Sequence, residues 1–296
     1  MAEQTAVTIG FFDGVHRGHQ ALLARTVAVA AEGRLKPVAV TFDLHRFEVL
    51  QHHALVPKLS TTEEKVELLR AGGAADVTVL AFTPEFAQLS GREFVTQVLI
   101  GQLGARHVVV GRDFRFGHDR ACGLAELQAL GRELDLGVEG VEPVLVDGER
   151  VSSNAIRRQL LAGEVAAARR LLGRPYSLAG PVVAGRRLGR TIGFPTANLA
   201  PDPRKVAPAV GVYAAWAECH GGRWPALVNF GVRPTVEDAG ELRLEAHLLS
   251  FEGDLYDRWL TVGFVQRLRG ERHFDSVAEL ARQIERDRRQ AKQILG

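Results

Sequence analysis

Two histidines, an aspartate and several glycines crowd into the stretch TIGFFDGVHRGHQALL, residues 8–23. His16 and His19 lie three positions apart, so on a helix both imidazoles reach one face and can bond the same group of oxygens. Glycines allow close backbone approach, and N–H groups at a helix start attract anions. The stretch therefore predicts a phosphate site rather than a solvated loop. Its expected members are Gly10, Asp13, Gly14, His16, Gly18 and His19.

The elements that would position this site alternate between apolar strands and helices. Such alternation predicts βαβ units and a parallel sheet, with ligands bound at the carboxyl ends of the strands. The motifs GFFDGVHRGH, TFDLH and GRDFRFG each begin where an expected strand ends. The expected strands are 7–9, 37–42, 76–82, 106–114 and 141–146, and the expected helices after the opening one are 61–73, 91–104 and 124–134.

From Tyr176 the pattern changes to short apolar runs separated by Gly, Pro and Asp, which favours an antiparallel barrel. A charged helix at 276–295 ends the chain, and two short helices at 152–173 precede the barrel. We place the boundary near residue 174, which gives domains 1–173 and 174–296. The expected barrel runs are 177–185, 211–219, 223–231, 242–249 and 260–269.

Composition limits the class of protein. With 296 residues, 46% of them hydrophobic and 24% charged, the chain can hold two globular domains. No apolar run approaches the roughly 20 residues of a membrane helix, and no signal peptide is evident, which predicts a cytoplasmic protein. Cys122 and Cys219 suggest neither a disulfide framework nor a zinc site. A net charge of +2 with scattered arginines disfavours nucleic acid as a partner.

A second candidate phosphate site lies in GRRLGRTIGFPTANL, residues 185–199. Its glycines and arginines, with Gly185, Arg190 and Gly193 as the expected contacts, suit a flexible phosphate cover. Thr196 and Asn198 follow a proline, and their side-chain oxygens suit a hard cation such as Mg²⁺. A plain surface hairpin is the alternative interpretation of this stretch.

Glu245 is the candidate general base of the second half. In LRLEAHLLSF the period of two places Glu245 on one strand face with Arg243 and His247, opposite the leucines. A carboxylate flanked by two potential cations can accept a proton from a hydroxyl. An outward charged face in water would give the same pattern.

The first half resembles the FAD synthetase module of bifunctional bacterial riboflavin kinase/FAD synthetases, through GFFDGVHRGHQALL, TFDLH, VVVGRDFRFG and VSSNAIRRQLLAG. The resemblance implies a Rossmann-like nucleotidylyltransferase domain in which the HxGH histidines, here His16 and His19, stabilise ATP phosphates. It also implies a second phosphate motif, on Ser152, Ser153 and Arg157. The alternative interpretation of the two serines is that they only cap the helix that follows.

This sequence departs from the common family pattern of the first half at three places. Phe11 stands where the opening motif usually has asparagine, and Asn154 stands where the second phosphate motif has threonine. The PHP of the family is Leu44-His45-Arg46 here. Nearby, His52-His53 is interpreted as part of a solvated loop.

The second half resembles riboflavin kinase, through GRTIGFPTANL, GVYAAW, VNFGVRPT, LEAHLLSFEGDLYD and RLRGERHFDSVAELARQIERD. The resemblance implies that Thr196 and Asn198 bind Mg²⁺ and nucleotide. It also implies that Glu245 deprotonates the terminal ribityl hydroxyl, which attacks the γ-phosphate of ATP. Asp257 replaces a glycine that is usual in the family.

Together the resemblances span residues 5 to about 292 and imply a bifunctional enzyme with ATP, riboflavin and FMN as small-molecule substrates and a divalent cation as cofactor. Neither nucleic acid nor membrane is an expected partner, and the oligomeric state is not predicted. Two alternatives stay open: a riboflavin kinase with a weak or inactive adenylyltransferase module, and a non-catalytic flavin- or RNA-binding regulator on the same fold. A nucleotidylyltransferase for another substrate leaves the PTAN motif unexplained.

Overall fold

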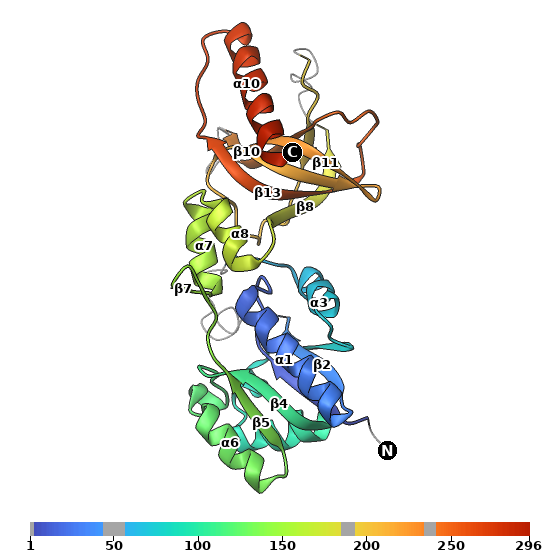
Figure 1. Cartoon of the computed structure of the whole chain (residues 1–296), viewed down its shortest axis with the longest axis vertical. Coiled ribbons are helices and arrows are strands. Elements are labelled where there is room, and N and C mark those ends of the chain that lie inside the picture. The colour runs from blue at the N-terminus through green and yellow to red at the C-terminus, as the bar shows by residue number, and fades with distance from the viewer. Residues whose placement is uncertain (1–2, 44–56, 185–192, 234–240) are drawn as a thin grey trace. The chain divides into compact units, whose positions relative to one another are not determined.

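The computed structural model describes residues 3–43, 57–184, 193–233 and 241–296, in two compact units, Met1–Ser153 and Asn154–Gly296. Figure 1 shows the elements of both units. Gly185 and Arg190 of the predicted phosphate cover lie outside the described residues, as do Leu44-His45-Arg46 and His52-His53.

The first unit is built on a five-stranded parallel sheet with the order β3-β2-β1-β4-β5. Its strands are β1 (Thr5–Ile9), β2 (Lys36–Phe42), β3 (Asp76–Leu80), β4 (Ala105–Gly111) and β5 (Gly137–Val141), with a small hairpin of β6 (Leu145–Val146) and β7 (Glu149–Arg150). Its helices are α1 (Arg17–Gly33), α3 (Thr62–Ala71), α4 (Pro84–Ala87), α5 (Gly91–Glu93), the π-helix η1 (Phe94–Gln102), the 3-10 turn η2 (His118–Arg120) and α6 (Leu124–Glu133).

Helices cover both faces of this sheet, because alternate residues of each strand face opposite layers. In β1, Val7 and Ile9 join the core made with η1 and α6, whereas Ala6 packs under α1. The start of α3 is fixed by Thr61, whose side chain forms a capping box with Glu64. The parallel α/β architecture expected from the sequence is therefore confirmed.

One strand prediction in this unit is wrong in position. The sequence places a strand at 141–146, whereas β5 ends at Val141 and within that span only the two residues of β6, Leu145–Val146, follow Pro143. Proline has no N–H to give to a ladder, so the parallel strand ends before it. Two glycines weakened the strand signal upstream. Of these, Gly140 packs against Leu124 of α6, whose side chain would have to shift to admit a Cβ.

The second unit contains a closed antiparallel barrel with the order β10-β11-β12-β9-β8-β13, as expected. Helix α10 packs on the barrel. Its Asp287, only 2% exposed, forms an ion pair with Arg269 of β13 at 2.8 Å. The strands are β8 (Tyr176–Val183), β9 (Ala197–Leu199), β10 (Gly211–Cys219), β11 (Gly222–Arg233), β12 (Glu241–Leu248) and β13 (Trp259–Arg269), and the helices are α7 (Ser153–Leu161), α8 (Val165–Leu172) and α10 (Val277–Leu295).

Helices α7 and α8 belong almost entirely to the barrel unit, so the compact units divide 20 residues before the predicted boundary at 174. Leu171 and Leu172 of α8 are only 3% and 1% exposed. The backbone N–H of Ala209 donates to the carbonyl of Leu160 in α7. The boundary at 174 therefore stays a prediction that fragments can test.

We expect a fragment of residues 154–296 to be more stable than one of residues 174–296. The shorter fragment exposes the barrel surface that α8 covers, and each large apolar side chain buried there contributes about 1.5–3 kcal/mol. Urea unfolding of both fragments measures the difference. Equal free energies of unfolding would show that α7 and α8 are a linker, and would support the boundary at 174.

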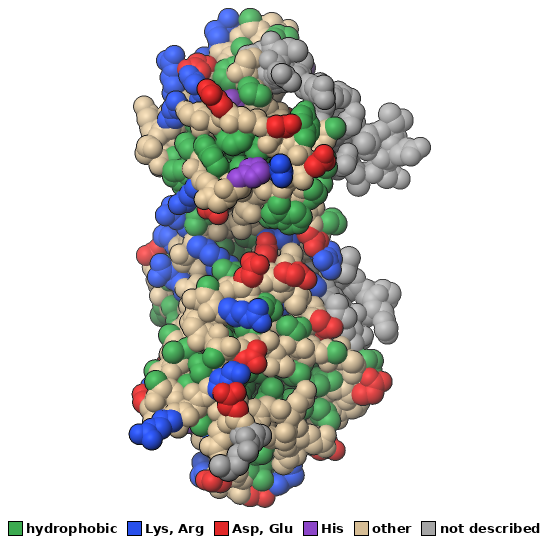
Figure 2. All heavy atoms as spheres, turned by 90° about the vertical axis from the view of Figure 1, so that its right-hand side faces the viewer, with side chains coloured by type: hydrophobic (Ala, Val, Ile, Leu, Met, Phe, Trp, Pro, Cys, Tyr) green, Lys and Arg blue, Asp and Glu red, His purple; other side chains and the backbone are tan. Residues whose placement is uncertain are grey.

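Among the described residues, no helix is long and apolar enough to span a membrane. On the face shown in Figure 2, basic and acidic side chains lie interspersed over both units. The expectation that the protein binds no nucleic acid stays a prediction.

Candidate active sites

The predicted phosphate loop lies at the carboxyl end of β1, the central strand of the sheet, and leads into α1. The loop turns sharply: Phe12, Gly14 and Val15 all have positive φ, at 48°, 81° and 38°. Only glycine adopts this region freely, so the backbone at Phe12 and Val15 is strained. Such strain is typical of functional sites that the surrounding structure holds in place.

The two histidines stand against each other at the start of α1. Their rings stack with centroids 3.6 Å apart. The backbone N–H of His19 donates to Nδ1 of His16 at 3.3 Å, so His16 caps the helix. A neutral His16 therefore carries its proton on Nε2. A Cβ at position 18 would lie 3.2 Å from the His16 ring, so a larger residue there would require that ring to shift.

His19, the second histidine of the pair, lies in the first turn of α1. Its Nδ1 is covered and has no hydrogen-bond partner within the described part of the chain. Desolvation by burial lowers the pKa of His19 well below its usual 6.5, and the neighbouring charges of His16 and Lys65 lower it further. The ring is therefore neutral at pH 7 and able to share a hydrogen bond with a ligand.

Asp13, predicted as a phosphate contact, forms hydrogen bonds with the backbone of the segment before α3. Its carboxylate accepts the N–H groups of Leu59 at 2.9 Å and Ser60 at 3.2 Å. In return, the N–H of Gly14 donates to the hydroxyl of Ser60 at 2.9 Å. A carboxylate accepting two backbone N–H bonds holds the phosphate loop against the segment that precedes α3.

The second predicted phosphate motif is divided between the two units. Ser153 donates to the carbonyl of Asp13 at 2.9 Å, which links the motif to the phosphate loop within the first unit. Arg157 lies on α7 in the second unit and donates to the side chain of Asn154 at 2.7 Å. The amide oxygen of Asn154 thus orients Arg157. The hydroxyl of a threonine, on a shorter side chain, would reach less far toward Arg157. Ser152 is half-buried just before α7.

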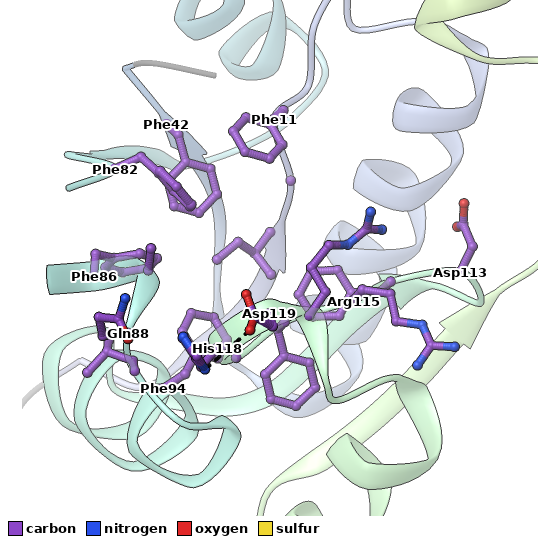
Figure 3. A pocket seen from close by; sticks show the side chains of 18 residues that line it. Phe11, Phe42, Phe82, Phe86, Gln88, Phe94, Asp113, Arg115, His118 and Asp119 are labelled. Carbon is purple, nitrogen blue, oxygen red and sulfur yellow. Dashed lines mark ion pairs between the residues drawn. The ribbon is translucent and has the colours of Figure 1, made fainter. Parts of the chain in front are cut away.

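A cavity of about 510 Å³, not predicted from the sequence, adjoins the phosphate loop at Gly10. Figure 3 shows Phe11, Phe42, Phe82 and Phe86 gathered along one side of it. The Phe11 and Phe42 ring centroids are 5.0 Å apart. Polar side chains line the other side: Asp113, Arg115, His118 and Asp119.

This aromatic cavity fits a flat apolar ring system with a polar edge. Aromatic faces bind planar rings by stacking or edge contacts, and a few polar groups orient the ligand. The only local signal in the sequence is that Phe11, Phe42 and Phe82 each follow a strand or end it. Phe11, the departure from the common asparagine, is thus a wall of the cavity.

In the barrel unit, strand register brings Glu245 into one row with two amides. Glu245 of β12 lies opposite Asn198 of β9 and opposite Asn229 of β11. Residues directly opposite in antiparallel strands share a face. The predicted face of Glu245 is confirmed, because Leu244 and Ala246 on either side are buried, with exposed fractions of 1% and 0%.

The surroundings of Glu245 are partly charged. The guanidinium of Arg243 lies 3.8 Å from its carboxylate. His247 on the same face bonds through Nδ1 to the carbonyl of Pro195 at 2.8 Å, so Nδ1 carries the proton. Burial lowers the pKa of His247, although that hydrogen bond opposes the shift. His247 therefore fixes the segment before Thr196 rather than serving as a cation.

Thr196 lines a second cavity, of about 480 Å³, in the barrel unit. Its lining includes Pro195, Phe251 and Tyr256. Asn198 of β9 lies on the face of Glu245, and Thr196 is the residue just before that strand. Gly193, just upstream, has a φ of 83°.

Two separate sites suited to phosphate chemistry are typical of a transferase with two activities. Comparison with known proteins identifies the family. Residues 1–155 match the family model described as FAD synthetase, and residues 172–295 match the one described as riboflavin kinase. A bifunctional riboflavin kinase/FMN adenylyltransferase of Pseudomonas fluorescens is 43% identical over 95% of this chain and 89% of its own. The Escherichia coli K12 protein of that name is 37% identical over 99% and 94%.

The chain therefore belongs to the family of bifunctional riboflavin kinase/FMN adenylyltransferases. A crystal structure described as a macrolide-efflux protein from Streptococcus pneumoniae has the same fold, with a TM-score of 0.92 and 31% identity. The match covers 99% of this chain and 95% of that one. The activity in its description concerns that protein.

Proposed function

We propose that the barrel unit phosphorylates riboflavin to FMN and that the α/β unit adenylylates FMN to FAD, each at the expense of one ATP. The observation that carries this proposal is that each unit has its own site, and each matches the family model of one reaction. The cytoplasmic location expected from the sequence stays a prediction.

In the first reaction, Glu245 accepts the proton of the terminal ribityl hydroxyl. The oxygen then bonds to the γ-phosphorus of ATP as the bond to the β-phosphate oxygen breaks, releasing ADP. Catalysis of such transfers is mostly positioning and charge neutralisation. Gly185, Arg190 and Gly193 are proposed to cover the phosphates. The cavity beside Thr196 has the size and partly aromatic lining to take the nucleotide base.

A divalent cation fits the oxygen donors of this site. Thr196 offers a hydroxyl and Asn198 an amide oxygen, and register places Asn198 opposite Glu245. Mg²⁺ prefers oxygen ligands and usually keeps substrate phosphates among them. We propose that Thr196 and Asn198 hold the cation, which screens the charge of ATP when bound.

In the second reaction, a phosphate oxygen of FMN attacks the α-phosphorus of ATP, and pyrophosphate leaves. His16 and His19 are proposed to bond the phosphate oxygens, together with backbone N–H groups of the loop from Gly10 to Gly18. Ser152, Ser153 and Arg157 are proposed as further phosphate contacts. Asp13 holds the loop in place by accepting the N–H groups of Leu59 and Ser60. The aromatic cavity is proposed to receive the isoalloxazine ring, since it adjoins the loop at Gly10.

A time course with riboflavin, ATP and Mg²⁺, resolved by chromatography, tests both assignments at once. We expect FMN to appear first and FAD to follow, with ADP and pyrophosphate released in proportion to each. EDTA should stop both reactions. Accumulation of FMN without FAD, also when FMN is supplied directly, would reduce the proposal to a riboflavin kinase. Absence of both products would favour a non-catalytic flavin-binding protein.

A further inference from the structure

Lys65 of α3 is a buried cation beneath the adenylyltransferase site, and no motif in the sequence draws attention to it. Only 7% of its surface is exposed. Burying an ammonium group is costly unless hydrogen bonds replace its hydration. A lysine in this position therefore needs a structural or functional reason.

The acceptors of Lys65 supply that reason. Its Nζ donates to the carbonyl oxygens of Phe42 at 2.8 Å and Phe11 at 3.3 Å, and to the hydroxyl of Thr41 at 3.2 Å. Thr41 in turn donates to the same Phe11 carbonyl at 3.1 Å. One ammonium group thus joins the ends of two neighbouring parallel strands, β1 and β2.

Those two strand ends carry the rings of the aromatic cavity. Phe11 and Phe42 both line it, with ring centroids 5.0 Å apart. Phe11 is also the first residue after Gly10 in the phosphate loop, so the position of its carbonyl affects the loop and the cavity together. Figure 3 shows these two rings side by side at the wall of the cavity.

The residues just before α3 reinforce the same connection. Leu59 and Ser60 donate their N–H groups to Asp13 of the phosphate loop. The charge of Lys65 is also close enough to His19 to lower the pKa of that ring. The residues just before α3 therefore contact the phosphate loop, and Lys65 of α3 contacts the two strand ends and, through its charge, affects His19.

We propose that Lys65 is a positioning residue for FMN adenylylation: by binding the carbonyl oxygens of Phe11 and Phe42, it fixes the spacing of the two rings that contact the flavin. Lys65 itself touches no substrate. This inference rests on the proposed assignment of the aromatic cavity to the isoalloxazine ring.

The test removes the ammonium group and keeps an unbranched side chain that is one heavy atom shorter, in K65M. We expect the KM for FMN in FAD formation to rise about tenfold, which is the size of one lost charge-assisted hydrogen bond, while kcat at saturating FMN changes little. Riboflavin phosphorylation by the other unit should be unchanged. K36M is the matched control, because Lys36 also lies in the first unit but makes only surface ion pairs.

A second variant, T41V, removes only the hydroxyl that bridges Lys65 and Phe11. It should raise the KM for FMN less than K65M, and the effects of the double variant should fall short of the product of the single ones. If K65M does not fold by circular dichroism, the KM for FMN of T41V decides. An unchanged KM in the folded variants, or a loss of kcat and thermal stability alone, would overturn the proposal.

Titration of free FMN into the protein separates this inference from the proposed function. Weaker FMN binding by K65M, in a protein that forms FAD, supports both. If the wild type binds FMN but forms no FAD, the proposed activity fails while weaker binding by K65M still supports the role of Lys65. If the wild type forms FAD and K65M binds FMN equally well, only the inference about Lys65 fails.

Discussion

Replacing His19 with alanine is expected to lower FAD formation at least about 100-fold, because loss of one donor that meets developing charge costs on the order of 10²–10³ in kcat. His19 suits this role because it lies in the first turn of α1 beside His16, and its Nδ1 has no hydrogen-bond partner among the described residues. Its lowered pKa keeps the ring neutral, which avoids a buried cation before ATP arrives. FAD formation from supplied FMN, followed by chromatography, measures the loss.

The same chain provides the control for this variant. The barrel unit should phosphorylate riboflavin at the wild-type rate, since Glu245 and its neighbours belong to a separate compact unit. His16 would be a less clean target, because it caps α1 and its removal costs about 1 kcal/mol of helix stability as well. Parallel loss of both activities in H19A, with the circular dichroism unchanged, would contradict two independent sites.

The lowered pKa of His19 also predicts how H19A changes acid stability. The native ring binds a proton less readily than the unfolded one, so its contribution to stability is present above the usual pKa of 6.5 and is lost as the pH falls toward the lowered value. The variant lacks this dependence. Urea unfolding at pH 7.5 and 5.5 should therefore show the wild type losing more stability on acidification than H19A.

The architecture was predictable because local patterns determine it. Alternating strands and helices indicated the parallel sheet, and the period of two in β12 placed Glu245 on the face opposite Leu244. The strand expected at 141–146 failed because Pro143 ends the pairing that its apolar neighbours suggest. Strand β9 was missed since three residues, Ala197–Leu199, are too short to show alternation.

The contacts inside the sites were less predictable, because they depend on strand order and register. The phenylalanines of the aromatic cavity come from separate segments, and no spacing in the sequence joins Phe11 to Phe42 or Phe82. The phosphate role of Asp13 stays a prediction, and its hydrogen bonds to Leu59 and Ser60 could not be predicted because those partners are more than forty positions away. Histidines at HxGH spacing were predictable because one helical turn brings them together.

Replacing Glu245 with glutamine is expected to lower riboflavin phosphorylation by about 10²–10⁴, the usual contribution of a general base. Glutamine keeps the shape of the side chain but cannot accept the hydroxyl proton. FAD formation from supplied FMN should continue at the wild-type rate. E218Q is the matched control, because Glu218 lies on β10 of the same barrel and makes only an exposed ion pair with Arg223.

The response of E245Q to Mg²⁺ distinguishes a base from a cation ligand. Asn198 lies opposite Glu245, so a carboxylate at this position is also close to the proposed cation site. If Glu245 acts only by holding the cation, raising the Mg²⁺ concentration should restore the rate, since weakened binding is overcome by mass action. If it removes the proton, the rate at saturating Mg²⁺ stays low, and we expect this result. A variant with the wild-type rate at ordinary Mg²⁺ would make Glu245 part of a charged surface and would require another base for the kinase.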